Sequence, residues 1–291
     1  SYDIIKKKDS LNKNALSITN KISFEDKYFQ YRQTMPALSY FGNAFTNNIN
    51  DKVTLENFNT ELGLEYNNNI IGSINFAVDY TDVNYGYNRV VLFPNETIPN
   101  RIKLNFIGVK AGYTKTINFL SIAGKAGINL SDDFSGNFLD GAIEIKLNDD
   151  LKLSGGININ SSLPNYNFLL YQSDYINYNW RHLNDFENIN TQQLKFSITS
   201  DKYFNAALDI SNIDNYTYFN LEETIDNVKI IKPKQYNNSL QYLRLKVQKE
   251  FRVGSFGLDN TIMYQNVVSD ENVINLPNLI TRNTFYYTNH I

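Results

Sequence analysis

The chain has 291 residues, with 27 Lys or Arg, 30 Asp or Glu and no Cys, so its formal net charge is −3. This balance, without a long basic run, argues against nucleic-acid binding, and the lack of cysteine excludes disulfide bonds and thiolate metal sites. No stretch of about 18 consecutive apolar residues is present, which excludes a transmembrane helix but leaves a membrane β-barrel open. The 21 Tyr and 19 Phe suit pleated sheets better than helices.

The first residues are polar and rich in lysine, so we expect residues 1–14 to form a polar N-terminal segment. Any export signal would have been removed or would lie outside this sequence. Residues 15–291 are predicted to form one β-barrel domain. One or two strands are expected among residues 15–45 and about eleven from Leu55 onward.

Alternation of apolar and polar side chains predicts strands, because successive residues of a strand point to opposite faces of the sheet. In chain order, the pattern is visible over residues 73–80, 120–131, 143–160 and 243–248. Within residues 143–160, two alternating runs flank Asn148-Asp149-Asp150, which predicts a hairpin with a short turn. Each run has one apolar and one polar face, whereas a strand buried on both faces would be apolar throughout.

The connections alternate between short and long. Short turns are expected at residues 67–69, 114–117, 148–150, 200–202 and 252–255, and long polar segments at 81–100, 131–140, 161–191, 211–239 and 266–280. An up-and-down barrel needs this order, because every second connection lies on the same rim. The fold class predicted is therefore all-β, an antiparallel up-and-down transmembrane β-barrel with short turns on one rim and long loops on the other.

The last strand is expected over residues 282–290, with no partner strand after it. An open sheet would leave unpaired backbone groups in lipid, each at a cost of several kcal/mol. We therefore expect the domain to lack its closing strands in this sequence.

Charged residues on the polar faces define the candidate functional residues. If the apolar faces meet lipid, these charges face the interior of the barrel and require water there. The candidates for this lumen-facing set are Lys103, Lys125, Glu144, Lys146, Lys152, Arg244, Lys246 and Glu250. The key test is whether Ile145, Leu153 and Leu245 lie on the outer wall or in a dry interior.

The segment 161–191 is rich in aromatic residues, among them Tyr171, Tyr175, Tyr178 and Trp180. Such rings stack on sugars or line a constriction, but packing of a loop over the barrel mouth is the simpler interpretation.

We expect no catalytic residues, no cofactor and no metal ion. His182 and His290 are too few for a typical zinc site, and only His182, near Asp185, could serve a hydrolase. The acidic pairs Asp132-Asp133 and Asp149-Asp150 are more simply turn residues than calcium ligands. The protein is therefore not expected to be an enzyme.

Two segments carry a family resemblance. The stretch 242–290, including LDNTIMYQNV and RNTFYYTNH, and the stretch PNYNFLLYQSDY with NYNW resemble the putative porin family of Bacteroidota outer membranes. The resemblance extends over most of the chain after Lys21. It implies an outer-membrane location and a diffusion role, with no catalytic residue carried over and no known substrate.

The favoured hypothesis is a bacterial outer-membrane porin-like barrel for passive diffusion of small hydrophilic solutes. Its partners would be outer-membrane lipid and those solutes, and no nucleic acid. One alternative is a closed barrel that serves as a binding or structural partner of envelope proteins. Another is a soluble β-sandwich that binds carbohydrate, although such a fold has no reason to alternate short and long connections.

Overall fold

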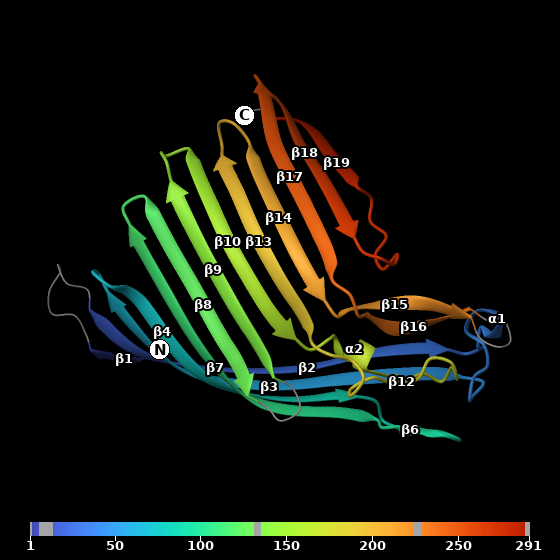
Figure 1. Ribbon diagram of the computed structural model, residues 1–291. Helices are drawn as coiled ribbons and strands as arrows, with labels where there is room; N and C mark the ends of the chain where they lie inside the picture. The colour runs from blue at the N-terminus through green and yellow to red at the C-terminus, as the bar shows by residue number, and fades with distance from the viewer. Residues whose placement is uncertain (1, 6–13, 131–134, 224–228, 289–291) are drawn as a thin grey trace.

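A computed structural model describes residues 2–5, 14–130, 135–223 and 229–288 of the chain. Its main feature is one antiparallel sheet of thirteen strands, in which each strand pairs with the next main-sheet strand along the chain (Figure 1). In sheet order the strands are β1 (Tyr2–Ile5), β2 (Ala15–Gln33), β3 (Ile49–Asn68), β4 (Gly72–Gly86), β7 (Arg101–Ile117), β8 (Leu120–Leu130), β9 (Gly136–Lys146), β10 (Leu151–Ser162), β13 (Ile189–Ser200), β14 (Asn205–Asp214), β17 (Leu240–Val253), β18 (Phe256–Val268) and β19 (Leu279–Tyr287).

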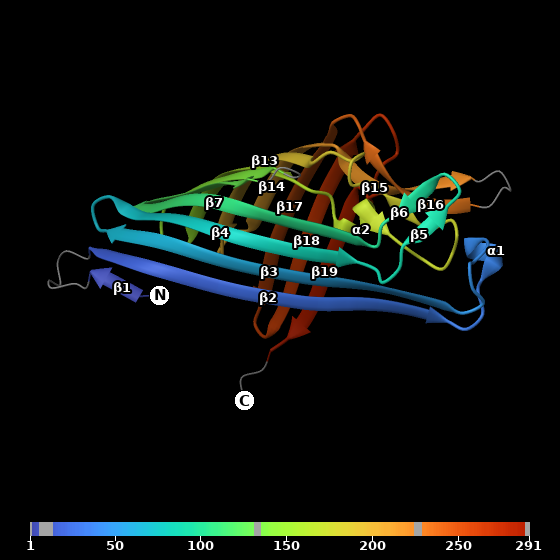
Figure 2. The same cartoon turned by 90° about the horizontal axis from the view of Figure 1, so that it is seen from below.

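Smaller elements lie in the long connections at one end of the curved sheet (Figure 2). They are two helices of one turn, α1 (Leu38–Phe41) and α2 (Tyr166–Leu169), and three hairpins, β5–β6 (Val91–Phe93 and Glu96–Ile98), β11–β12 (Leu170–Tyr171 and Trp180–Arg181) and β15–β16 (Tyr216–Glu223 and Lys229–Tyr236). None of the helices in the described ranges is long and apolar enough to cross a membrane.

The expected number of strands is confirmed. The main sheet contains eleven strands from β3 onward and β2 before them, while β1 lies within the predicted N-terminal segment and pairs with β2. Among the described residues, β1 and β19 form the two edges of the sheet. The division into residues 1–14 and 15–291 stays a prediction.

The alternation of short and long connections is also confirmed, except that residues 136–140 of the predicted long segment 131–140 belong to β9. The short turns lie at one end of the sheet, which we call the short-turn rim, and the long connections lie at the other end, which we call the mouth. The side-chain oxygen Oδ1 of Asn148 accepts hydrogen bonds from the backbone of Asp150 and Leu151, and this side-chain turn closes the β9–β10 hairpin.

One predicted turn is wrong. Residues 114–117 belong to β7, and the turn follows at residues 118–119, where Asn118 has a φ of 52°. Asparagine tolerates this left-handed conformation better than most residues, so the local chemistry favours Asn118 over the preceding Thr-Lys-Thr-Ile as the turn position.

The convex face of the sheet carries an exposed apolar belt. Its members lie at alternating positions of neighbouring strands: Leu62, Leu64, Phe76, Val78, Ile107, Tyr113, Ile122, Ile128, Leu139, Ile143, Ile157, Leu194, Phe196, Ile210, Leu245 and Ile262. An exposed apolar surface of this extent is not stable in water and indicates contact with lipid.

Ile145, Leu153 and Leu245 lie on this convex face. Ile145 pairs with Leu153, and Leu245, which is 41% exposed, pairs with Leu208. The three side chains therefore do not meet in a dry interior, and the soluble two-sheet sandwich is wrong.

The polarity of the two faces is inverted towards the mouth. In β4, the convex face changes from apolar residues to Asp82 and Asn84, whereas the concave face changes from polar residues to Val83 and Tyr85, which are 3% and 8% exposed. The same change occurs in β3 and β7, which pair with β4 on either side. These strands have 15 to 20 residues, more than the 9 to 11 that a tilted strand needs to cross a bilayer, so their ends project beyond the apolar belt.

Candidate functional site: the concave face and the mouth

Seven of the eight predicted lumen-facing residues lie on the concave face. The cross-strand pairs establish this, because directly paired residues share a face: Glu144 pairs with Ser121 and Ser154, and the row continues through Ser197 and Ala207 to Lys246. The residues on this face are Lys125, Glu144, Lys146, Lys152, Arg244, Lys246 and Glu250.

The eighth residue, Lys103, lies on the convex face and is exposed, so its assignment to the lumen is corrected. Lys103 pairs with Asn84 and shares its face of β7 with Ile107 and Tyr113 of the apolar belt. The prediction assumed one polar face along a whole strand. The polarity is inverted near the mouth, and Lys103 is exposed there while its neighbour Leu104 is buried.

The concave face also carries a charged cluster that the sequence analysis missed. Lys110 of β7 lies 2.8 Å from Oδ1 of Asp79 in β4 and 3.1 Å from Oε2 of Glu61 in β3. Asn59 donates hydrogen bonds to Asp79 and, at 2.7 Å, to Thr81. Period-two alternation in β3, β4 and β7 could have identified this cluster.

A second ion pair lies on the same face, where Arg244 of β17 contacts Asp209 of β14 through both Nε and Nη2, at 2.8 and 2.6 Å. Among the other predicted charges, Lys146 lies 2.9 Å from Asp149 and Glu250 lies 3.0 Å from Arg252, whereas Lys152 and Glu144 are 3.9 Å apart. Charges of both signs therefore line the concave face, and the surface must be hydrated.

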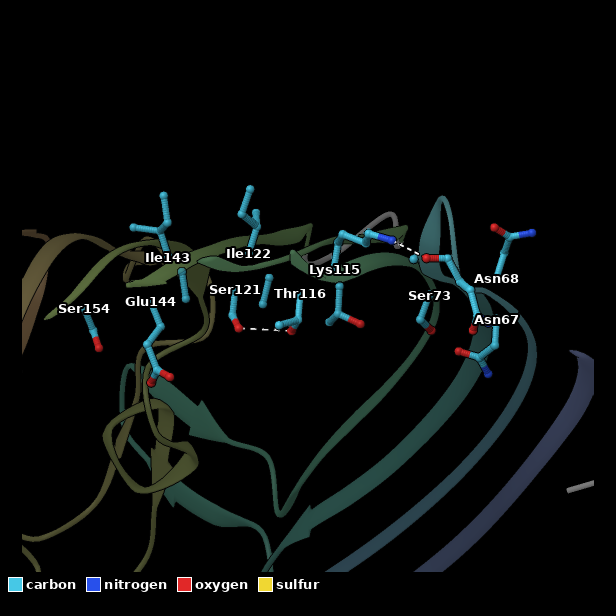
Figure 3. A pocket seen from close by; sticks show the side chains of 15 residues that line it. Asn67, Asn68, Ser73, Lys115, Thr116, Ser121, Ile122, Ile143, Glu144 and Ser154 are labelled. Atoms are coloured by element: carbon cyan, nitrogen blue, oxygen red, sulfur yellow. Dashed lines mark hydrogen bonds between the residues drawn. The ribbon is translucent and has the colours of Figure 1, made fainter. Parts of the chain in front are cut away.

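A pocket of about 590 Å³ lies on this face near the short-turn rim, and most of the residues that line it are polar. Figure 3 shows Ser121, Glu144 and Ser154 pointing to the side on which the rest of the chain lies, whereas Ile122 and Ile143 point the opposite way. The small hydroxyl side chains leave this part of the wall hollow, and Glu144 supplies its acidic group.

The connection between β10 and β13, residues 163–188, is here called the mouth loop. It reaches past β9 and β8 and packs on the projecting ends of β7 and β4. Leu169 and Leu170 are fully buried there with Val83, Tyr85 and other apolar residues of the concave face. This cluster explains why the concave face becomes apolar at the mouth.

The loop aromatics pack the mouth loop, which is the simpler of the two predicted interpretations. Tyr175 and Trp180 are buried, and Trp180 stacks on Tyr171 with ring centroids 4.7 Å apart. The hydroxyl group of Tyr175 donates to Oε1 of Gln33 at 2.7 Å and accepts a hydrogen bond from the backbone of Ala37. Tyr178 is half-buried and makes an edge contact with Phe41.

A network of three charged residues anchors the mouth loop to β3. Asp174 of the loop accepts a hydrogen bond from the backbone of Asn50 at 2.7 Å and lies 2.5 Å from Nη1 of Arg89. Asp51 accepts hydrogen bonds from the Ser173 hydroxyl group and from the backbone of Asp174. Both carboxylates are at least nine-tenths buried.

Burial raises the pKa of the Asp51 carboxyl group above its ordinary value of 3.8. The hydrogen bonds from Ser173 and Asp174 and the charge of Arg89 act in the opposite direction, and the negative charge of Asp174 raises the pKa further. Asp51 lies at the mouth end of β3, beyond the apolar belt.

The side chain of His182 contacts two nearby residues of the same loop. Its ring stacks on Phe186, and its Nδ1 atom lies 3.3 Å from Asp185. Within the described ranges, no group of three or more His, Asp or Glu residues could hold a metal ion. Asp150 accepts hydrogen bonds from Ser200 and Lys202 as a turn residue, while Asp132 and Asp133 lie outside the described residues.

The comparison with protein families matches the putative porin family over residues 1–291. The chain belongs to this family. A comparison with curated proteins finds no match. Family membership and the exposed apolar belt agree with a strand-built wall in lipid.

The solved structures similar to this chain are outer-membrane receptors and transporters. They include the copper transporter OprC (TM-score 0.65, 11% identity, 95% of this chain and 49% of that chain), the siderophore receptor PirA from Acinetobacter baumannii (0.64, 10%, 94% and 46%) and a mutant of the ferric enterobactin receptor PfeA from Pseudomonas aeruginosa (0.59, 10%, 87% and 41%). At this identity the likeness shows the fold alone. The porin-family chain spans about half the length of these structures.

Together the family and the fold place the protein in the bacterial outer membrane as a porin-like β-barrel. Barrels of this membrane have short turns on the periplasmic side and long loops outside. The mouth of this porin-family sheet, with its loop 163–188, is therefore the extracellular end.

Proposed function

We propose that this chain forms part of the wall and the extracellular mouth of an outer-membrane channel for passive diffusion of small hydrophilic solutes. The observation that carries the proposal is the contrast between the two faces. The convex belt is apolar, while the concave face carries charges of both signs, including Asp79, Lys110, Asp209 and Arg244. Such a wall is stable only if it encloses water, and enclosed water offers a path for polar solutes.

The mouth loop supports a restricted channel. It is fixed over the concave side by the buried cluster around Leu169 and by Asp174, so it narrows the entrance. Entry by diffusion through a narrow charged opening depends on size and charge of the solute and needs no catalytic group. We propose no enzymatic activity for the chain.

The direct test is conductance of the full-length protein in planar lipid bilayers, with swelling of proteoliposomes in sugar solutions as the second readout. A channel gives ion conductance above the lipid background and faster swelling with smaller sugars. A folded, heat-modifiable protein that gives neither result contradicts the proposal.

The second candidate is a closed barrel that acts as a binding or structural partner of envelope proteins. The packed mouth loop favours it, because a loop fixed inside the entrance can also close the entrance. Folded protein without conductance, recovered from cells in a stable complex cross-linked through its extracellular loops, would favour this second function.

A further inference from the structure

A second polar pocket, of about 680 Å³, lies at the mouth, where β10, β13 and β14 end. It is separate from the hollow near the short-turn rim and from the anchor of the mouth loop. The residues that line it are Ser135, Ser161, Arg181, Leu183, Asn184, Phe186, Glu187, Asn188, Asn190 and Asn215.

Arg181 is the distinctive residue of this pocket. It is half-buried, yet among the described residues no carboxylate, carbonyl or aromatic ring is its side-chain partner. By contrast, Arg89 and Arg244 each contact a buried carboxylate. Trp180, the neighbour of Arg181 in β12, is buried in the mouth loop, so alternation along the strand directs Arg181 to the other side.

Among the described residues that line the pocket, the only acidic one is Glu187, and its carboxylate is already hydrogen-bonded. Glu187 accepts a hydrogen bond from Nδ2 of Asn215 at 3.0 Å, and Asn188 donates to the backbone of Ser135 at 2.6 Å. These contacts fix the shape of the pocket. The side-chain amides of Asn184 and Asn190 make no hydrogen bond to described residues and remain available to a ligand.

We propose that this pocket binds a sugar that carries a carboxylate group. The planar guanidinium group of Arg181 matches a carboxylate through two parallel hydrogen bonds, and the free amides match sugar hydroxyl groups. Phe186 adds an apolar side to the pocket, with its ring already held in place by His182, 4.6 Å away. Binding of an acidic sugar in this pocket is an additional function, separate from passage of solutes through the channel, and it does not require the protein to conduct ions.

The test compares galacturonate with galactose, which differ only in the carboxylate group. Binding of each to the full-length protein in detergent is measured by isothermal titration calorimetry. We expect galacturonate to bind at least about tenfold more tightly than galactose, as one charge-assisted bidentate contact implies. Equal binding of the two sugars overturns the proposal, and so does the absence of galacturonate binding both as the free sugar and as the head group of a glycolipid.

Two substitutions sharpen the result. Arg181→Gln should abolish the preference for galacturonate, and Arg181→Lys should retain only part of it, because a lysine cannot form the planar double contact. The matched control is Arg101→Gln, since Arg101 lies at another part of the mouth and already contacts Thr54 at 2.7 Å. An equal loss in the control variant contradicts a site at Arg181.

The same chemistry is offered by free acidic sugars and by acidic glycolipid head groups of the outer leaflet. Binding is therefore also measured with liposomes that carry a galacturonate-bearing glycolipid. Arg181-dependent binding of the free sugar or of these liposomes supports the proposed sugar site. Bilayer conductance is recorded for Arg181→Gln in parallel. If Arg181→Gln loses galacturonate binding but keeps its conductance, the sugar site is separate from the proposed channel. If the unchanged protein binds galacturonate but does not conduct, only the proposed channel function is contradicted.

Discussion

Lys110 of β7 places its ammonium nitrogen 2.8 Å from Oδ1 of Asp79, on the concave face of the neighbouring strand β4. Glu61 of β3, the cross-strand partner of Asp79, lies 3.1 Å from the same ammonium nitrogen, so one cation balances two carboxylates. Removal of this single positive charge would therefore change the net charge of this part of the channel wall.

Replacement of Lys110 by Gln leaves Glu61 and Asp79 without their cation and should increase the preference of the channel for cations. A shift in the K⁺/Cl⁻ permeability ratio on the order of twofold is expected from one charge in a hydrated pore. Reversal potentials in a KCl gradient measure it. Lys103→Gln is the matched control, because Lys103 lies on the convex face beyond the belt; an equal shift in this variant would contradict the assignment of the faces.

Gly108 provides the space for Asp79. A Cβ atom at Gly108 would lie 2.3 Å from Oδ1 of Asp79, so Gly108→Ala should displace the carboxylate and lower the free energy of unfolding by about 1–3 kcal/mol. Urea unfolding in lipid vesicles measures the change. Gly124→Ala is the control, because its Cβ atom would meet only a backbone oxygen at 3.9 Å, and a similar loss there would indicate a general effect of glycine replacement.

Arg89→Gln should loosen the mouth loop. The substitution leaves the buried carboxylates of Asp51 and Asp174 without their arginine, and they repel each other. We expect higher single-channel conductance and faster proteolysis within residues 163–188. Asp185→Asn, at a carboxylate 67% exposed in the same loop, should change neither readout.

The convex face should not tolerate charge. Leu245→Arg places a guanidinium group in lipid at a cost of about 2–4 kcal/mol near the bilayer centre. Ser154→Arg, on the concave face, should fold almost normally because its charge meets water. The two variants are compared by the fraction of heat-modifiable, folded protein after refolding into vesicles. An equally low fraction for both would contradict the assignment of the convex face to lipid and the concave face to water.

The closure of the mouth should depend on pH through Asp51. Its pKa is raised in the folded protein, so the protonated form is favoured there and docking of the mouth loop is strengthened as the pH falls through the raised pKa. Above that pKa the charged Asp51 faces the charged Asp174, and the contribution of Asp51 protonation to docking of the mouth loop is lost. We expect conductance to fall on acidification of the extracellular side through the raised pKa of Asp51.

Asp51→Asn carries no titratable group and should keep the low conductance at every pH. Conductance of the two proteins recorded over the same pH series provides the measurement. A pH dependence that persists unchanged in Asp51→Asn would assign it to another group.

The sequence alone predicts the antiparallel barrel wall, the alternation of short and long connections and the convex position of Ile145, Leu153 and Leu245. These features depend on period-two alternation and on turn residues such as Asn148, which act over a few residues. Seven of the eight candidate charges lie on the predicted face for the same reason.

Only the tertiary structure decides where the buried residues of a strand change from one face of the sheet to the other. Lys103 and Leu104 obey the period of the strand, but the mouth loop covers the concave face there, so the buried side is the inner one. Tyr175 and Gln33 are 142 residues apart in the sequence, and no local pattern predicts that they meet. The structure of the wall is determined by periodicity over a few residues. The structure of the mouth is determined by packing between segments that are far apart in the sequence, so it depends on the fold of the whole chain.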